Sequence, residues 1–293
     1  MTIYDAIETA ACELYLRALK DIPADVRAAL AGALRNEQSA GHQTAEQVMF
    51  TILENIETAD SENTLVCQDT GIPVFKAVIG IPVDVAELEL RLKRGCEHAT
   101  ATYPLRSNTV HPLTRRNTGT NTGRGIPVIK LEFAPDLGCI RLVMAPKGSG
   151  SENMSSLKML TPAEGARGVQ KFVLQCIFES GAKPCPPMIV GVGLGGTSDV
   201  AMQLAKEAST FRKIGSANPD PDAATLEREL LDKINQTGIG PQGLGGATTA
   251  LAVHVEWAHT HISQNPVAVN IQCWRGERAE ASISGEGEIE YAV

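Results

Sequence analysis

The chain has 293 residues, of which 43% are hydrophobic and 20% charged, an ordinary composition for a folded protein with a substantial core. Its 34 acidic and 26 basic residues give a net charge of −8, which disfavours nucleic acid as a partner because phosphate binding needs a cationic surface. No apolar run approaches the roughly 20 residues of a membrane span. The first residues lack the basic segment of a secretory signal, so we expect a cytoplasmic protein.

The first 60 residues are expected to be helical. Apolar residues recur at helical spacing over 3–18 and again over 48–56. Thr44 followed by Gln47 predicts a capping box at the start of the second of these helices. A further helix should begin near Asp84.

The middle of the chain changes to a strand pattern. Apolar and polar residues alternate over 128–133 and over 140–144, which predicts two neighbouring, half-buried strands. The sequence Thr161-Pro-Ala-Glu164 combines a capping residue, a proline at the first helical position and a glutamate that closes the box. It predicts a helix that ends at Gly181.

The last third is expected to contain a buried strand over 188–192, helices from about Ser198 and over 222–238, and alternating strands over 248–257 and 266–273. Helices lead the chain, and helices and strands then mix without a regular strand–helix–strand repeat. The pattern predicts an α+β fold in which mixed, largely antiparallel strands pack with helices.

Three glycine-rich segments raise the question of a nucleotide site: 147–151, 191–197 and 238–246. By letters alone, Gly191, Gly193 and Gly196 spell G-x-G-x-x-G between a strand and a helix, as in a dinucleotide-binding loop. The acidic residue expected about 20 residues on, at the end of a second strand, is missing because that region is predicted to be helical. Close backbone contact is the alternative for each segment, and three together favour main-chain amides that suit an anion.

The seven cysteines divide into two groups. Cys67, Cys185 and Cys273 each stand beside polar or proline residues where the chain is expected to turn. The other four lie on apolar helix faces or open a strand, so burial in the core explains them better: Cys12, Cys96, Cys139 and Cys176. No pair has the C-x-x-C spacing of a zinc ribbon or ferredoxin. Spacing alone therefore leaves the first three open as either structural thiols or metal ligands.

A series of ordered motifs resembles the class I (iron–sulfur) fumarate hydratases and the related L-tartrate dehydratase α-subunits. The resemblance runs from about residue 40 to the end of the chain. Its motifs are Cys67-Gln-Asp-Thr-Gly71, Pro104-Leu-Arg106-Ser-Asn108, Asn117-Thr-Gly-Thr-Asn121, Lys147-Gly-Ser-Gly-Ser-Glu-Asn153, Cys185-Pro-Pro187, Gly238-Ile-Gly-Pro-Gln242 and Cys273-Trp-Arg275. So many motifs in the family's order make the resemblance specific.

The resemblance implies a 4Fe–4S cluster held by Cys67, Cys185 and Cys273. Three protein ligands leave one iron open, which can act as a Lewis acid on the hydroxyl and one carboxylate of a substrate. Gln68 and Asp69 would contact that substrate, and Asp69 is a candidate partner in removing its carbon-bound proton. A non-catalytic iron–sulfur protein is the alternative of another class, although three ligands favour substrate access over electron transfer.

The resemblance also implies the binding of a C4 dicarboxylate. The planar guanidinium of Arg106 would bind one carboxylate. Lys147, Gly148 and Gly150 would offer a cation and main-chain amides to the same anion. His261 matches a family histidine near the site, and a surface histidine in a polar turn is the alternative.

The resemblance further implies a partner. Single-chain family members continue into a C-terminal domain beyond the point that corresponds to Val293, so we expect the α-subunit of a split enzyme. In this interpretation residues 1–293 form one iron–sulfur hydro-lyase α-domain, with a helical segment over 1–60. A separate β-subunit would complete the pocket, in a dimer of αβ pairs.

Two motifs favour fumarate as the substrate. The Lys147–Asn153 loop and Gly195-Gly-Thr197 are typical of fumarate hydratases rather than of tartrate dehydratases. Ser149 departs from the pattern, because a third glycine is usual there. L-tartrate and mesaconate remain alternatives, and mesaconate differs from fumarate by one methyl group, which is worth only about 1–3 kcal/mol of discrimination.

Overall fold

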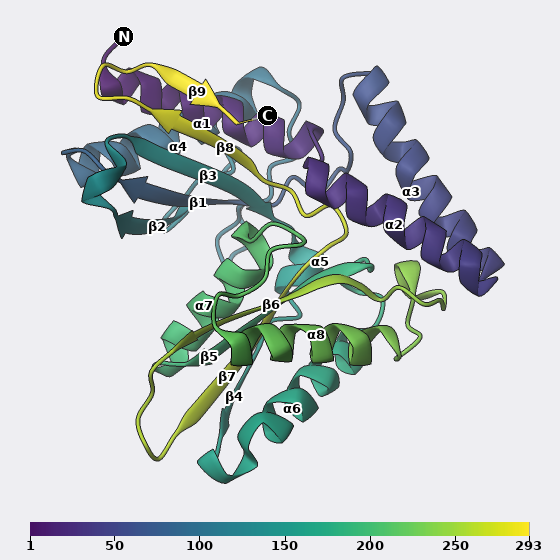
Figure 1. Ribbon diagram of the computed structural model, residues 1–293. Helices are drawn as coiled ribbons and strands as arrows, with labels where there is room; N and C mark the ends of the chain where they lie inside the picture. The colour runs from purple at the N-terminus through teal and green to yellow at the C-terminus, as the bar shows by residue number, and fades with distance from the viewer. Residues whose placement is uncertain (293) are drawn as a thin grey trace. The chain divides into compact units, whose positions relative to one another are not determined.

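The computed structural model describes residues 1–292 and has an α+β fold, as the sequence predicts (Figure 1). Contacts between residues divide the chain into two compact units, each assembled from separate segments. Unit 1 comprises Met1–Pro23, Ala59–Gly148 and Glu277–Val293, and unit 2 comprises Ala24–Thr58 and Ser149–Gly276. No helix among residues 1–292 is long and apolar enough to cross a membrane.

Unit 1 is built on a five-stranded sheet in the order β2-β1-β3-β8-β9 (Figure 1). Its strands are β1 (Ile72–Ile79), β2 (Val128–Phe133), β3 (Ile140–Lys147), β8 (Ala279–Ile283) and β9 (Ile289–Tyr291). Two helices, α1 (Ile3–Lys20) and α4 (Val85–Thr102), pack on each other and share their core with the sheet. The predicted start of α4 is confirmed, because the Asp84 carboxylate accepts the N–H groups of Ala86 and Glu87.

One sequence prediction about this sheet is wrong. The two alternating runs form β2 and β3, but both strands flank β1 instead of pairing with each other. β1 escaped prediction because it is buried on both faces and therefore shows no alternation. β2 is the half-exposed edge strand.

Unit 2 is built on a four-stranded sheet in the order β4-β7-β5-β6. The strands are β4 (Ser156–Leu160), β5 (Met188–Gly195), β6 (Ala250–Ala258) and β7 (Asn265–Gln272). The helices of this part of the chain are α2 (Ala24–Ala40), α3 (Gln43–Ser61), α5 (Ser149–Glu152), α6 (Gly165–Ser180), α7 (Ser198–Phe211) and α8 (Pro221–Asn235). The short 3-10 turns η2 (Pro162–Glu164) and η3 (Pro241–Gly243) complete the set.

Local signals predicted most of these helices. Thr161 and Glu164 form the expected capping box ahead of α6, and Gly181 ends that helix with a φ of 52°. The predicted start of α3 is wrong, because the carbonyl of His42 already accepts the Glu46 N–H. Thr44 therefore lies inside the first turn of α3 rather than at its cap.

The glycines of β5 allow a helix to pack directly on the strand backbone. Met188, Val190 and Val192 share a buried core with α6 and α8, whereas α7 packs against the sheet through small residues. A Cβ atom at Gly191 would lie 2.1 Å from the Ala205 carbonyl oxygen of α7, closer than real Cβ contacts. These glycines thus lie inside a strand and serve helix packing, so the nucleotide-loop alternative is wrong for this segment.

Candidate functional site

The motif Cys67–Gly71 lies in unit 1, in the segment that follows α3 and precedes β1. A buried tyrosine holds its backbone in place. The Tyr15 hydroxyl donates to the carbonyl oxygens of Thr70 at 3.1 Å and Gly71 at 3.4 Å. Burial raises the pKa of Tyr15, which keeps it a donor at every working pH. A Cβ atom at Gly71 would lie 2.7 Å from the Lys147 nitrogen, so the two backbones are in close contact. The segment Cys67–Gly71 is thereby fixed beside the end of β3.

Thr70 connects this segment to two further motifs of unit 1. Its hydroxyl donates to the Arg106 carbonyl at 2.7 Å and accepts from the Asn108 side-chain amide at 2.8 Å. The fully buried Asn121 donates to the same Arg106 carbonyl at 3.0 Å and accepts the Asn108 N–H at 2.6 Å. Three motifs far apart in sequence thus form one hydrogen-bonded group.

The candidate substrate-binding residues of unit 1 surround this group. Gln68 and Arg106 are exposed, while Asp69 is half-buried and accepts the Gly71 N–H at 3.1 Å. Lys147 is only 2% exposed. The structure therefore brings the segments with Gln68, Asp69, Arg106 and Lys147 together, with two polar side chains free to face a ligand.

Cys185 and Cys273 lie side by side in unit 2. Cys185 precedes β5 and Cys273 follows β7, and these antiparallel strands pair Ile189 with Gln272, so the start of one meets the end of the other. The Trp274 N–H donates to the Cys185 carbonyl at 3.3 Å. Cys185 is exposed and Cys273 is half-buried. Two of the three candidate ligands are thus neighbours, while Cys67 belongs to unit 1.

The glycine-rich segment 238–246 lies against the same cysteine loop. The main-chain N–H and the side-chain amide of Gln242 both donate to the Pro186 carbonyl, at 2.8 and 2.9 Å. A Cβ atom at Gly150 would lie 2.8 Å from the Lys183 carbonyl, so the start of α5 also contacts this loop. Unit 2 therefore gathers Gly150, Cys185 and Gln242 in one place.

Among residues 1–292, five non-glycine residues have a positive φ, and three of them lie in these motifs. Cys185 has a φ of 55°. Gln242, which donates hydrogen bonds to the carbonyl of Pro186, has a φ of 53°. Asn121 in unit 1 has the same left-handed conformation, with a φ of 55°. Each such residue costs about 1–3 kcal/mol and persists only where its surroundings hold it, a pattern that is typical of functional sites.

His261 stands apart from the cysteines of its unit. It lies in the exposed connection from β6 to β7, where its Nδ1 is 2.8 Å from the Ser263 hydroxyl. Cys273 follows the other end of β7, so roughly 25 Å of extended strand separates the two residues. Within unit 2, His261 thus lies on the surface at the opposite end of β7 from Cys273.

The remaining cysteines are buried or half-buried. Cys96 and Cys176 are buried, and Cys12 packs half-buried against the core of unit 1. Burial raises the pKa of the Cys176 thiol to about 11, so it stays protonated and unreactive. None of the seven cysteines forms a disulfide. Within residues 1–292, no group of three or more His, Cys, Asp or Glu side chains is arranged to hold a metal ion.

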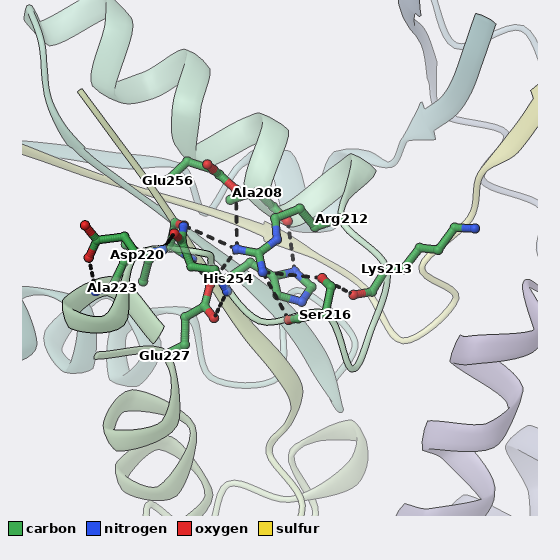
Figure 2. Close-up of polar contacts among 11 residues, drawn as sticks. Ala208, Arg212, Lys213, Ser216, Asp220, Ala223, Glu227, His254 and Glu256 are labelled. Atoms are coloured by element: carbon green, nitrogen blue, oxygen red, sulfur yellow. Dashed lines mark hydrogen bonds and ion pairs between the residues drawn. The ribbon is translucent and has the colours of Figure 1, made fainter. Parts of the chain in front are cut away.

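A polar network in unit 2, which sequence reasoning missed, lies outside these motifs (Figure 2). The Arg212 guanidinium donates to Glu227 at 2.5 Å, to Glu256 at 3.3 Å and to the Ser216 carbonyl at 3.0 Å. Glu227 also accepts the Val255 N–H at 2.8 Å. The Glu227 carboxylate is fully engaged in fixing the connection between α7 and α8, so the network serves the fold. Arg212 is 15 residues from Glu227 and 44 from Glu256, so no local pattern links these charged partners.

Comparison with known proteins shows similarity over most of the chain. The family model for fumarate hydratase (Fumerase) matches residues 8–282. A protein of Methanocaldococcus jannaschii with the provisional name L(+)-tartrate dehydratase subunit alpha is 45% identical over 94% of this chain and 97% of its own length. The L(+)-tartrate dehydratase subunits alpha of an Escherichia coli strain and of Shigella sonnei are each 38% identical over 82% of this chain and 79% of their own length.

Proposed function

The chain belongs to the fumarate hydratase family, and on that premise we propose that it is the α-subunit of an iron–sulfur hydro-lyase that adds water reversibly to fumarate to form (S)-malate. The observation that carries the proposal is the convergence of the family's motifs. In unit 1, Thr70, Arg106 and Asn121 join three motifs through hydrogen bonds, and in unit 2 Cys185 and Cys273 are neighbours. The left-handed residues Asn121, Cys185 and Gln242 support a functional role for these motifs, because such strain persists only where the surroundings hold it.

The proposed cofactor is a 4Fe–4S cluster with Cys67, Cys185 and Cys273 as its ligands. The donor set fits, because cysteine thiolates are the usual ligands of iron–sulfur clusters, and three of them in place of the usual four would leave one iron accessible. The paired cysteines of unit 2 support two of the three assignments. When bound, the cluster would supply Lewis acidity toward the hydroxyl and a carboxylate of the substrate.

The proposed roles of the other residues follow from their exposure and charge. Arg106, whose loop is fixed through its carbonyl while its side chain is exposed, would bind one substrate carboxylate in a bidentate manner. Gln68 would orient the substrate through hydrogen bonds. Asp69 would exchange the carbon-bound proton, since its carboxylate is half-buried and already oriented by the Gly71 N–H. Lys147, Gly148 and Gly150 would add a cation and main-chain amides.

His261 is left out of this assignment. Its exposed turn lies at the opposite end of β7 from Cys273. A base must lie within hydrogen-bond reach of the proton that it removes. Within unit 2 the arrangement gives His261 no such access to the cysteine loops.

The proposed assembly contains a second kind of subunit. The relatives' names include the words "subunit alpha", which imply a partner subunit. A dicarboxylate carries two negative charges, and Arg106 and Lys147 are the family cations that this chain offers. We infer that a β-subunit supplies the groups for the second carboxylate, that residues 1–293 act as one α-domain, and that αβ pairs form dimers.

L-tartrate is the second candidate substrate, and the names of the relatives favour it. Malate and tartrate both lose a hydroxyl group and a proton from adjacent carbons, so the same residues serve either reaction. The two substrates differ by one hydroxyl group, which a site must hydrogen-bond in order to prefer tartrate. The Lys147–Asn153 loop keeps fumarate as the first choice.

The test is an anaerobic assay of the iron-reconstituted chain together with its β-subunit. Fumarate hydration and L-tartrate elimination are followed separately by absorbance at matched substrate concentrations. We expect the ratio of kcat/KM values to favour malate and fumarate. A ratio that favours tartrate would reassign the substrate, and no turnover of either would overturn the hydro-lyase.

A further inference from the structure

We propose that Glu37 is a positioning residue for the cluster ligand Cys185, and that it acts through the glycine-rich segment 238–246. The inference rests on the proposed function, because it assigns a purpose to the order that Glu37 creates around a cluster thiolate. Glu37 itself lies on α2, outside every motif that the sequence singled out.

Glu37 is a fully buried carboxylate with a complete set of partners. Its Oε1 accepts the Thr248 N–H at 2.7 Å, and its Oε2 accepts the Ala247 N–H at 2.9 Å. The Nδ1 atom of His42, which is half-exposed, lies 2.9 Å from Oε2. Burying a charge in this way is costly unless hydrogen bonds compensate for lost water, so the arrangement indicates a specific task.

We assign Glu37 the task of anchoring the glycine-rich segment 238–246. Residues 238–246 contain five glycines, which offer no side chains to pack and lose much backbone entropy on ordering. A Cβ atom at Gly240 would lie 2.1 Å from the Gly245 carbonyl carbon, so the segment folds back tightly on itself. A Cβ atom at Gly246 would lie 2.9 Å from the Glu37 Oε2, so the backbone passes directly over the carboxylate. Glu37 therefore fixes the end of this segment.

The segment in turn holds the loop that contains Cys185. Gln242 places two donors on the Pro186 carbonyl, and the neighbouring carbonyl of Cys185 accepts the Trp274 N–H. Gln242 does this from a left-handed conformation that must be held by its surroundings. The path from Glu37 to Cys185 thus runs from the Glu37 carboxylate through the main chain of the segment to the two donors of Gln242.

Residues that hold a metal ligand in place affect the affinity of the site for its metal. Partners of the ligands typically change metal affinity by about 10–100-fold when they are removed. An iron–sulfur ligand in a strained, exposed loop depends on such support more than a ligand inside a strand. Glu37→Gln should therefore loosen the segment, because an amide has one acceptor atom and cannot serve both N–H groups.

The experiment compares wild type, Glu37→Gln and a matched control, Glu227→Gln, in the full chain. Glu227 is also a buried glutamate of unit 2 that accepts two main-chain N–H groups and pairs with a cation, but its network does not reach the cysteines. Hydrogen exchange is measured in the iron-free chain, and the rate of iron loss to a chelator is measured after anaerobic reconstitution. Exchange at Ala247 and Thr248 should be at least about tenfold faster in Glu37→Gln, as expected for losing a hydrogen bond to a charged group.

Iron loss should be faster by about tenfold or more in Glu37→Gln and unchanged in Glu227→Gln. If exchange accelerates but iron loss does not, or if both variants lose iron equally fast, the positioning role is wrong. If wild type binds no iron, the proposed function fails, and hydrogen exchange alone then decides whether Glu37 anchors the segment. If Glu37→Gln does not fold, Gln242→Ala decides: faster iron loss with unchanged exchange at Ala247 supports the path, and wild-type iron loss refutes it.

Discussion

Gly193→Ala should be severely destabilising, because the residue lies where α7 rests on β5. A Cβ atom there would stand 2.0 Å from the Ala201 carbonyl oxygen and 2.6 Å from the Ala205 nitrogen. An ordinary contact needs roughly 3.5 Å, so the helix would have to retreat by about 1.5 Å along this line. Both opposing atoms belong to the backbone of α7, and no rotamer change can relieve them.

The expected loss is at the upper end of the overpacking range, about 3 kcal/mol in the free energy of unfolding. Urea unfolding followed by circular dichroism measures it. The matched control is Gly32→Ala in α2, the same substitution in the same unit, where the nearest atom to the added methyl is a flexible Arg35 nitrogen at 3.8 Å. Replacing a helical glycine by alanine should stabilise by about 0.5–1 kcal/mol.

The two variants should thus move the unfolding midpoint in opposite directions. A Gly193→Ala protein as stable as wild type would refute the packing argument. It would also reopen the possibility that the glycines of β5 are kept for ligand binding rather than for close packing.

Four further predictions follow from individual side chains. Serine at any one of the three proposed cluster cysteines should abolish iron binding after anaerobic reconstitution, whereas Cys176→Ser should leave the iron content unchanged; an iron assay decides. In the iron-free chain, iodoacetamide should modify the exposed Cys185 but not Cys176, whose thiol pKa burial raises to about 11, as mass spectrometry will show. Burial alone would raise the pKa of Glu37, but the N–H donors and His42 outweigh it and hold the pKa below its usual value. Its contribution to stability should therefore be present above the unfolded pKa of about 4.3 and disappear as pH falls further, so the stability gap between wild type and Glu37→Gln should close in acid and not in base. Arg106→Ala in the αβ complex should lower kcat/KM by about 100-fold or more, because a bidentate charge pair with the substrate is lost, and an unchanged value would remove Arg106 from the site.

Local chemistry made parts of the fold predictable. The caps at Asp84 and at Thr161–Glu164 involve residues at most three positions apart, so the sequence displays them directly. The apolar face of α6 and the alternation of β2 follow from the periods of helix and strand. These features depend on neighbours in the chain and need no knowledge of the tertiary structure.

Long-range features could not be predicted in this way. β1 gave no alternating signal because both its faces are buried, and its absence from the prediction made β2 and β3 look like partners. The candidate site was found through motif resemblance, yet the bonds that assemble it span 36 residues from Thr70 to Arg106 and 211 from Glu37 to Thr248. No periodicity reports contacts of that kind.

One measurement tests the central claim most directly: anaerobic turnover of fumarate by the iron-reconstituted chain, with and without its co-expressed β-subunit. The account predicts that malate forms only when iron and both subunits are present, and that activity falls in air as the accessible iron is oxidised. Turnover by the chain alone would contradict the split-subunit assignment. An iron-loaded complex that acts on neither fumarate nor L-tartrate would contradict the hydro-lyase itself.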